Sequence, residues 1–466
     1  MSRPVAWSAV VPDRLQPILD EVQPLAGRFA DAGHKIYLVG GIVRDLLLGR
    51  ELRDPDFDLT TDALPDQTQV LLTGWAGAVW DQGARFGTIG AKFGDRTYEI
   101  TTHRAESYSP DSRKPEVAFS TDIEADLSRR DFTVNAMALS LPEPELIDPF
   151  GGAADLAAGV LRTPSGPETS FDDDPLRMMR AARFIAGYGL TPEDGLRDAV
   201  VAMADRIDIV SAERVRDELD KLLVVDDPSD GLWFLVDTGL ADHFLPELGA
   251  MKLEQDPIHH HKDVLAHTIA VVAKTRAERI VRLSALLHDI GKPRTRSIGE
   301  NGVSFHHHEV VGARMTRRRM TEMRYSNDDI DSVSRLVELH LRFHTYKMGW
   351  TDSAVRRFVR DAGPLLDELI ELTRCDCTTR NQRKAATLAA RMDELVVRIG
   401  ELQDEEELAS IRPDLDGTQV MELLDLRPGP DVGRAMNYLL ELRLEEGPLD
   451  PDDAAVRLKD WWAGQS

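Results

Sequence analysis

The stretch YLVGGIVRDLLLGRELRDPDFDLTTDA, residues 37–63, decides the fold that we predict for the first part of the chain. It reads as a strand, a Gly-Gly turn, a helix that ends at Gly49, and a second strand. Because side chains alternate across a strand, we expect Asp56 and Asp58 on one face of the second strand, about 7 Å apart. Like carboxylates this close raise each other's pKa unless a cation lies between them. The pattern therefore predicts a bound cation, although a solvated strand edge would carry the same residues.

The Gly-Gly turn at residues 40–41 precedes this strand. Glycine lets the backbone approach a ligand closely, and the start of the following helix offers unpaired N–H groups to a phosphate. Such turns are common, so the turn alone is weak evidence for phosphate binding. Turn and strand together supply both parts of a nucleotide-transfer site. One part is a cradle for the triphosphate, and the other holds metal ions that activate the attacking hydroxyl and neutralise pyrophosphate.

The composition predicts a globular protein of several domains. The chain has 466 residues, of which 42% are apolar and 29% charged, enough for packed cores in two to four domains. The net charge of −25 argues at first against a nucleic-acid partner. The charge is uneven, however. Residues 401–466 carry 17 acidic and 6 basic side chains, a net of −11, whereas residues 312–324 are strongly basic.

The cysteine content and the distribution of apolar residues indicate where the protein works. Cys375 and Cys377 are the two cysteines, and one residue separates them, so they form no disulfide framework. This is typical of a reducing cytosol, and we expect a cytoplasmic protein. The N-terminus lacks the apolar core of a signal peptide, and nowhere do eighteen apolar residues run together. We therefore expect neither export nor a membrane partner.

The chain changes character near residue 151. Before it, helical patterns alternate with the strand-like runs KIYLVGG, PDFDLTT, TIGAKFG, TYEITTH and NAMALSL, and after it periodic helical segments dominate. The predicted fold is α+β, with a small mixed or antiparallel sheet in an N-terminal head and helices in the remainder. We place the head at residues 1–158, a helical neck at 159–228, a helical body at 229–400 and a helical tail at 401–466.

Four motifs in order resemble the class II tRNA nucleotidyltransferase and poly(A) polymerase family. They are VGGIVRDLLLG, DPDFDLTTDA, SRRDFTVNAMA (128–138) and DDDPLRMMRAARF (172–184). The resemblance implies that the catalytic Mg²⁺ ions are bound by Asp56 and Asp58, with Glu99 in YEITTHR as a plausible third carboxylate. It also implies a nucleotide site, in which Gly41 and Arg44 hold the triphosphate and Arg130 and Asp131 contact phosphate and ribose.

The last of these motifs bears on the choice of base. Asp174 before Pro175 predicts a helix start. Arg177, Arg180 and Arg183 follow at three-residue spacing as a cationic stripe, which could also be an ordinary basic helix face. In the family, the acid and arginine that match Asp174 and Arg177 read the incoming base without a template, and we assign Arg180 to the same nucleotide site.

The chemistry of the bases suits that role. Cytosine and adenine each offer an amino donor beside a ring-nitrogen acceptor, which a carboxylate and a guanidinium match, whereas uracil and guanine do not. Where the family usually has Glu-Asp-x-x-Arg, this chain has Asp173-Asp174-x-x-Arg177, so the role of the first acid is open.

The expected product is the CCA end of tRNA, made from CTP and ATP. Residues 103–119, HRAESYSPDSRKPEVAF, look like the flexible loop of CCA-adding members of the family. Residues 80–93 do not look like the arginine-rich signature of poly(A) polymerases, which stay the alternative. Members that add only CC or only A belong to the same family. The expected partners are tRNA and the two nucleotides, and no obligate protein partner is evident.

A second set of motifs resembles the HD superfamily of phosphohydrolases. The motifs are HTIA (267–270), ALLHDIGK (285–292), FHHHEVVGA (305–313), LVELHLRF (336–343) and TRCDCTTR (373–380). The resemblance implies a metal site made by His267, His288, Asp289, His308, His340 and Asp376. Such nitrogen and oxygen ligands suit Mn²⁺, Fe²⁺, Ni²⁺ or Mg²⁺, which generate hydroxide and polarise a phosphate ester. His306 and His307 compete with His308 for its place in the set.

Three kinds of function therefore compete. The first is a metal-dependent tRNA nucleotidyltransferase with a secondary phosphohydrolase activity on cyclic or nucleotide phosphates. The second is chiefly an HD phosphohydrolase with a nucleotide-binding head. The third is an RNA-binding factor whose two sites are inert, which the full set of expected ligands disfavours. We expect RNA to follow some of the arginines of residues 312–324, since phosphate binding needs Lys and Arg.

Overall fold

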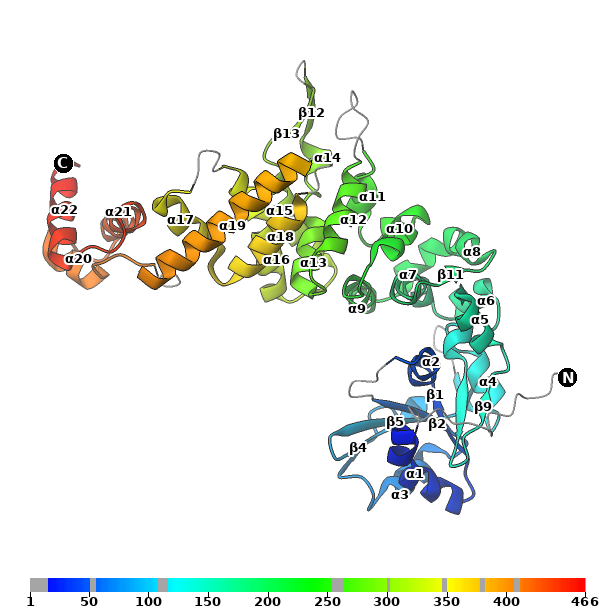
Figure 1. Ribbon diagram of the computed structural model, residues 1–466. Helices are drawn as coiled ribbons and strands as arrows, with labels where there is room; N and C mark the ends of the chain where they lie inside the picture. The colour runs from blue at the N-terminus through cyan, green and yellow to red at the C-terminus, as the bar shows by residue number, and fades with distance from the viewer. Residues whose placement is uncertain are drawn as a thin grey trace. The chain divides into compact units, whose positions relative to one another are not determined.

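The computed structural model describes residues 16–50, 56–107, 116–253, 263–299, 302–345, 350–377, 382–405 and 411–465. The chain forms two compact units (Figure 1). Unit 1 comprises Met1–Ser211 and Trp233–His243, and unit 2 comprises Ala212–Leu232 and Phe244–Ser466. Each unit is described by itself. Within the described residues, no helix is both long enough and apolar enough to span a bilayer.

Unit 1 is built on a seven-stranded sheet of order β3-β4-β5-β2-β1-β8-β9. Strands β2 and β5 run parallel, and the other neighbouring pairs are antiparallel. The sheet is therefore mixed, and the predicted α+β class is confirmed. Its strands are β1 (Ile36–Val39), β2 (Phe57–Thr61), β3 (Ala78–Trp80), β4 (Thr88–Phe93), β5 (Arg96–Thr102), β8 (Ala138–Leu141) and β9 (Leu146–Ile147).

The two faces of the sheet are covered differently. Side chains alternate between the two faces of β1, and Ile36 and Leu38 lie in a core shared with α1 (Gln16–Asp31) and with α3 (Pro65–Leu72). Tyr37 and Val39 point the other way, into a smaller core with α4 (Ile123–Ser128). Asp58 lies on the side of Tyr37 and Val39, because its neighbours Phe57 and Leu59 belong to the larger core. The carboxylate face is thus the one opposite α1 and α3.

Helices fill the rest of unit 1 (Figure 1). They include α2 (Gly41–Leu48), α5 (Gly152–Ala158), α6 (Pro167–Asp173), α7 (Leu176–Tyr188) and α8 (Leu196–Met203), with the 3-10 helices η1 (Ala84–Phe86), η2 (Thr133–Asn135), η3 (Ala204–Ile209) and η4 (Leu240–His243). The short pairs β6 (Arg104–Ser107) with β7 (Glu116–Phe119) and β10 (Val160–Leu161) with β11 (Thr191–Pro192) complete the unit. Helix α2 ends as predicted at Gly49, whose φ of +70° is a left-handed conformation that favours glycine.

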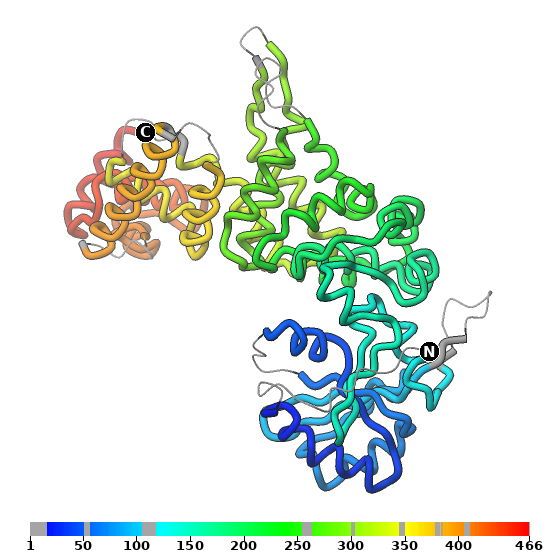
Figure 2. Tube along the Cα trace, turned by 45° about the vertical axis from the view of Figure 1, so that its right-hand side comes forward, coloured from blue at the N-terminus to red at the C-terminus, as the bar shows by residue number. Residues whose placement is uncertain are grey.

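In the residues that the structure describes, unit 2 is helical apart from one hairpin. Its helices are α9 (Ala212–Leu223), α11 (Pro246–Ala250), α12 (Val264–Lys274), α13 (Arg279–Leu287), α14 (Lys292–Thr295), α15 (His308–Glu322), α16 (Asn327–Leu339), α17 (Asp352–Ala362), α18 (Leu366–Asp376), α19 (Gln382–Glu405), α20 (Gly417–Leu424), α21 (Pro430–Glu446) and α22 (Pro451–Ala463), with η5 (Arg342–Thr345) and η6 (Gly363–Leu365). Helix α10 (Ser229–Asp237) is divided between the units. The hairpin of β12 (Arg296–Gly299) and β13 (Gly302–Phe305), which the sequence analysis did not predict, projects from the helices (Figure 2).

Candidate functional site

Three carboxylates gather on the open face of the sheet. Asp58 in β2 and Glu99 in β5 are direct partners in the parallel ladder, and Asp56 comes immediately before β2. The Asp58 residue is exposed, but the protein around its carboxylate displaces water, and this desolvation raises the pKa of Asp58. The positive charge of Arg130 lowers the pKa, whereas the negative charges of Glu99 and Asp56 raise it. The three acids therefore repel one another, as a site built for divalent cations would.

The Gly-Gly turn lies against this cluster. Gly40 has φ +73°, and a Cβ placed on it would lie 3.3 Å from Nη1 of Arg130 and 3.9 Å from Oδ2 of Asp58. A side chain there would fill the gap between the arginine and the acid, and L-residues rarely adopt this conformation. The structure therefore brings together the turn, the Asp58 carboxylate and the Arg130 guanidinium.

Arg130 is held by an acid that the sequence analysis missed. Asp126 on α4 is fully buried and accepts hydrogen bonds from Nη2 of Arg130 at 3.2 Å and from Nη2 of Arg129 at 2.7 Å. It also accepts the backbone N–H of Arg104, where β6 begins. Burial alone would raise the pKa of Asp126, but the two arginines lower it to about 2. The i,i+4 spacing of Asp126 and Arg130 was the available signal.

Asp131 and Arg180, which were both predicted to contact the nucleotide, form hydrogen bonds within the protein. One carboxylate oxygen of Asp131 accepts from the side chain of Asn135 and the N–H of Phe132, and the other accepts from Arg180. Burial opposes ionisation, yet these donors, Arg180 foremost, hold the pKa of Asp131 below its ordinary value. The Asp131–Arg180 pair thus ties α7 to the segment before β8.

Arg44 on α2 is also enclosed. Its guanidinium donates to both carboxylate oxygens of Asp45 and to Oδ1 of Asn135 at 2.6 Å, and lies 4.1 Å from the ring centroid of Tyr188. A Cβ on Gly41 would lie 3.3 Å from Nη2 of Arg44. Arg44 therefore lies directly behind the turn, between the sheet and α7.

The predicted base-reading pair lies at the start of α7. Oδ1 of Asp174 accepts the N–H of Leu176 at 3.2 Å, which confirms the helix start expected there. Arg177 is buried and donates to Oγ of Ser170 at 2.9 Å and to the carbonyl of Arg129. The carbonyl of Arg129 places Arg177 directly beside the Arg130–Asp131 segment.

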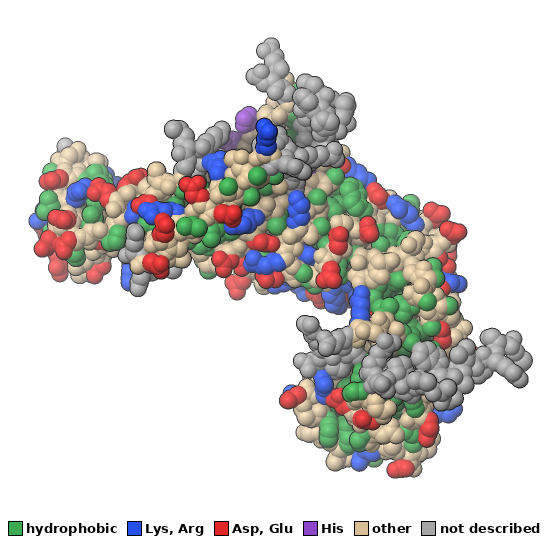
Figure 3. Space-filling view, viewed as in Figure 1, with side chains coloured by type: hydrophobic (Ala, Val, Ile, Leu, Met, Phe, Trp, Pro, Cys, Tyr) green, Lys and Arg blue, Asp and Glu red, His purple; other side chains and the backbone are tan. Residues whose placement is uncertain are grey.

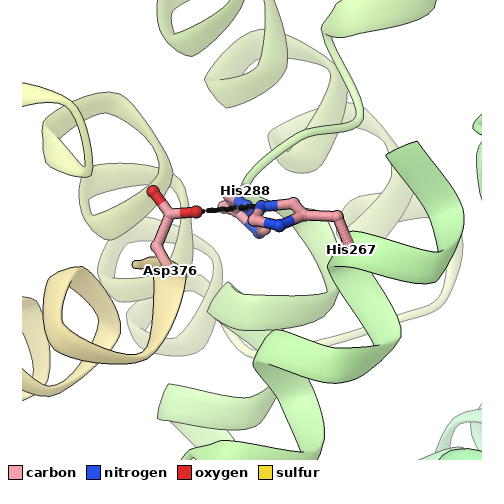
Figure 4. A group of neighbouring side chains, drawn as sticks. All are labelled: His267, His288 and Asp376. Carbon is pink, nitrogen blue, oxygen red and sulfur yellow. Dashed lines mark hydrogen bonds and ion pairs between the residues drawn. The ribbon is translucent and has the colours of Figure 1, made fainter. Parts of the chain in front are cut away.

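Six side chains converge in unit 2, between α12, α13, α15, α16 and α18. They form two groups whose possible ligand atoms lie within 4.8 Å of one another, one of His267, His288 and Asp376 and the other of Asp289, His308 and His340. Figure 4 shows the Asp376 carboxylate directed at the rings of His267 and His288, whose Nε2 atoms lie 2.9 Å and 3.5 Å from Oδ1. The six residues implied by the resemblance are thus assembled in one place.

Asp289 joins the two groups. Its Oδ2 lies 3.2 Å from Nε2 of His288 and 3.5 Å from Nε2 of His267, while its Oδ1 lies 3.3 Å from Nε2 of His308. The carboxylate therefore faces one group with each oxygen. Oδ2 also accepts from Nζ of Lys292 at 2.6 Å.

The orientation of the histidine rings fits metal binding. The Nδ1 atoms of His288, His308 and His340 each lie 2.6–2.8 Å from the carbonyl oxygen three residues earlier, so each Nδ1 carries the proton. In the neutral rings Nε2 is then a bare acceptor. Nε2 of His308 and Nε2 of His340 nevertheless lie 3.3 Å apart. Two acceptors this close need a positive charge between or beside them, which a divalent cation would supply.

The basic segment on α15 makes several internal ion pairs. Arg317 pairs with Asp331, and Arg318 and Arg319 pair with Glu247. Among the described residues, Arg314 is exposed and makes no hydrogen bond or ion pair. Charged side chains of both signs are interspersed over the face seen in Figure 3. The expected RNA path along this helix stays a prediction.

Three parts of the chain match models of known protein families. Residues 36–162 match the model of the poly A polymerase head domain, residues 189–251 that of a probable RNA- and SrmB-binding site of polymerase A, and residues 259–381 that of the HD domain.

Two relatives align over nearly the whole chain. The A-adding tRNA nucleotidyltransferase of Deinococcus radiodurans is 33% identical over 438 residues, which cover 91% of this chain and 95% of that protein. The CCA-adding enzyme of Streptococcus suis is 29% identical over 437 residues, 94% of each protein. The crystal structure of the Bacillus stearothermophilus CCA-adding enzyme in complex with CTP superposes with a TM-score of 0.68 at 23% identity, and the match covers 98% of this chain and 99% of that one. The last likeness shows a shared fold.

Proposed function

Because the chain belongs to the tRNA nucleotidyltransferase and poly(A) polymerase family, we propose that it adds CCA to tRNA 3′ ends from CTP and ATP without a nucleic-acid template. The observation that carries this proposal is the pairing of Asp58 with Glu99 beside Gly40 and Arg130. This arrangement would combine a cation site and a phosphate site on one sheet face. We place the enzyme in the cytoplasm, where its nucleotide and tRNA substrates would be met.

In the proposed reaction, the terminal 3′-hydroxyl of the RNA attacks the α-phosphorus of the nucleotide. The hydroxyl loses its proton, a P–O bond to the RNA forms, and the bond to pyrophosphate breaks. Bound Mg²⁺ would lower the pKa of the attacking hydroxyl and neutralise the departing charge. Asp56, Asp58 and Glu99 would hold the cations, since carboxylate oxygens are the ligands that Mg²⁺ prefers.

The neighbouring residues would position the nucleotide. We assign the triphosphate to the Gly40–Gly41 turn and Arg130, because the guanidinium already borders the turn and keeps Nε free of any partner among the described residues. Asp174 and Arg177 would face the base. The hydrogen bonds that Asp131, Arg180 and Arg44 form within the protein would hold α2, α7 and the segment before β8 in position around the nucleotide. The same side chains would also be available to contact the nucleotide.

The product distinguishes the possibilities within the family. The Deinococcus radiodurans relative is A-adding and the Streptococcus suis relative is CCA-adding, so relatives alone do not choose between them. We favour CCA because the sequence of residues 103–119 looks like the loop of full CCA-adding members, although residues 108–115 lie outside the described residues. The test supplies Mg²⁺, each nucleotide separately and both together to tRNA lacking CCA and to tRNA lacking only the final A, and then sequences the ends. CCA on the first acceptor supports the proposal. Extension of the second alone would indicate A addition, and a long A tail would indicate a polymerase.

The HD centre supports a second, phosphohydrolase activity. Two groups of ligands joined by Asp289 are suited to two divalent ions, which together can bind a phosphate ester and supply a hydroxide nucleophile. We propose hydrolysis of cyclic or nucleotide phosphates at this centre. Opening of a cyclic nucleotide phosphate to its phosphomonoester, or release of phosphate from a nucleotide, would test it if the reaction depends on an added divalent metal and survives substitutions in the carboxylate cluster.

Replacing Asp126 with Asn should weaken nucleotide binding more than it slows chemistry. Arg130 would exchange an ionic partner for a neutral one, and hydrogen bonds to charged groups contribute about 1.5–3 kcal/mol. We expect KM for CTP and ATP to rise roughly tenfold or more, with a smaller change in kcat, measured by steady-state addition to tRNA.

The matched control for this substitution is Asp122→Asn, which changes an exposed acid at the start of the same helix. Asn caps helices as well as Asp does, so little should change there. Because the pKa of Asp126 is about 2, its interactions are present above the ordinary aspartate range and are lost as pH falls from about 4 through 2. Titration of Asp126 should therefore not affect the pH dependence of nucleotide addition by the wild type above pH 5. Equal KM values for Asp126→Asn and wild type would contradict the positioning role.

A further inference from the structure

One row of residues crosses the open sheet face from its edge to the carboxylates. The ladders pair Trp80 with Gly90, Gly90 with Glu99, and Glu99 with Asp58. Directly paired residues point to the same side of a sheet, so all four lie on the carboxylate face. Neighbouring strands are about 4.8 Å apart, which puts the Cα of Trp80 about 10 Å from that of Glu99.

The indole of Trp80 lies across Gly90 toward Glu99. A Cβ on Gly90 would lie 2.0 Å from Nε1 of Trp80 and 2.1 Å from Cε2, so the ring occupies the space that any side chain at this position would need. Trp80 still exposes 36% of its surface, and its indole makes no hydrogen bond to the described residues. The ring is thus packed on one face and open on the other, beside the carboxylates.

A cationic side chain lies on the same face of the sheet as this ring. Lys92 is two residues from Gly90 on β4 and shares its face, since side chains alternate. It is exposed, and it makes no ion pair with the described residues. Phe93, by contrast, points to the opposite face and stacks on Trp75. An open aromatic ring with a nearby cation is the usual combination for binding a single-stranded nucleic-acid end.

The position of Trp80 and Lys92 relative to the carboxylates indicates which substrate binds beside them. Gly40 at the end of β1 and Arg130 before β8 border Asp58 on one side, and Trp80 lies on the other. In phosphoryl transfer the attacking and leaving oxygens are roughly in line, on opposite sides of the phosphorus. If pyrophosphate leaves toward Gly40 and Arg130, the hydroxyl must approach from the side of Trp80.

We propose that Trp80 stacks on the base of the 3′-terminal nucleotide of the acceptor RNA, and that Lys92 contacts a phosphate of the same RNA end. This inference rests on the proposed nucleotidyl transfer and adds the subsite for the acceptor. Stacking tolerates any base, because every base has a π face. A single ring can therefore serve an acceptor whose last base changes as each nucleotide is added.

The test compares acceptors with and without a terminal base. The probe is tRNA lacking CCA, either intact or with an abasic terminal nucleotide that keeps its hydroxyls. Trp80→Ala should lower kcat/KM for intact tRNA roughly 5- to 100-fold, leave KM for CTP nearly unchanged, and make the abasic acceptor no worse than the intact one. Trp80→Phe should recover most of the loss.

Gly90→Ala provides a second route to the same result. Its methyl group would displace the indole without removing it, so it should reproduce the loss, and Trp80→Ala/Gly90→Ala should be no worse than Trp80→Ala alone. Phe93→Leu, on the opposite face of the same strand, is the matched control and should act like wild type. An equal abasic penalty in wild type and Trp80→Ala would overturn the inference while leaving CCA addition intact. No extension of tRNA by the wild type would instead overturn the proposed function.

Discussion

Asp58→Asn should lower kcat/KM for nucleotide addition by at least about a thousandfold. The substitution keeps the shape of the side chain but replaces a charged cation ligand with a neutral amide. A bound metal ion stabilises charge in the transition state by several kcal/mol, and each 1.36 kcal/mol is a factor of ten. Asp58 lies between Glu99, its ladder partner, and the Gly40–Arg130 contact, at the centre of the proposed site.

The measurement is incorporation of labelled CTP into tRNA lacking CCA, with the Mg²⁺ dependence determined for each variant. The matched control is Asp62→Asn, just beyond the end of the same strand, where the carboxylate accepts from the N–H of Lys35 and pairs with His34. That variant should keep its activity. Phosphate release at the HD centre should also persist in Asp58→Asn, which would show that the protein is folded. Addition above one tenth of the wild-type rate would remove Asp58 from the catalytic cluster.

The head could be predicted well because its strands carry local signals. All five predicted strand runs became strands β1, β2, β4, β5 and β8, and the helix between the first two ends at Gly49 as expected. The edge strands β3 and β9 and the hairpin of β12 with β13 were missed. In β12 all four residues are exposed, so it has no apolar alternation by which a strand could be recognised.

Whether a candidate site residue could be predicted depends on how far away in the sequence its partners lie. Asp56 and Asp58 are visible in one tripeptide, whereas the contact of Trp80 with Gly90 depends on the register of two strands, which the sequence pattern does not specify. Arg44, Asp131 and Arg180 were predicted as nucleotide contacts from the family motifs. Their bonds to Asn135 and to one another became visible only once α7 was placed beside the sheet.

The need to satisfy buried polar groups explains why the charged residues of the candidate site also form hydrogen bonds within the protein. A guanidinium or carboxylate that lines a site and is removed from water must have its hydrogen bonds satisfied, because an unsatisfied buried group costs about 1–3 kcal/mol. Asp126 does this for Arg130, and Asp131 does it for Arg180. Conversely, Nε of Arg130 is buried without a partner among the described residues, beside the open turn. The proposed phosphate position is therefore where the protein leaves a donor unused.

At the second site, Asp289→Asn should remove most bound metal from unit 2 and abolish phosphate release, while CCA addition continues. Asp289 presents one oxygen to His267 and His288 and the other to His308, so its carboxylate faces both groups of ligands. A neutral amide is a poor ligand for a divalent cation, and it cannot offer negative charge to two ions at once. We expect the metal content, measured by mass spectrometry after dialysis against Mn²⁺-containing buffer, to fall toward zero.

Asp376→Asn is the matched variant that separates a bridging role from a terminal one. Asp376 contacts only the group of His267 and His288, at 2.9 Å and 3.5 Å, so its loss should reduce the metal content by about one ion and leave the site of His308 and His340 occupied. Both variants keep the side-chain volume, and near-unchanged CCA addition would show that the fold persists. If the two substitutions lower the metal content equally, Asp289 is not a bridge. That result would favour a single ion held by the six side chains together.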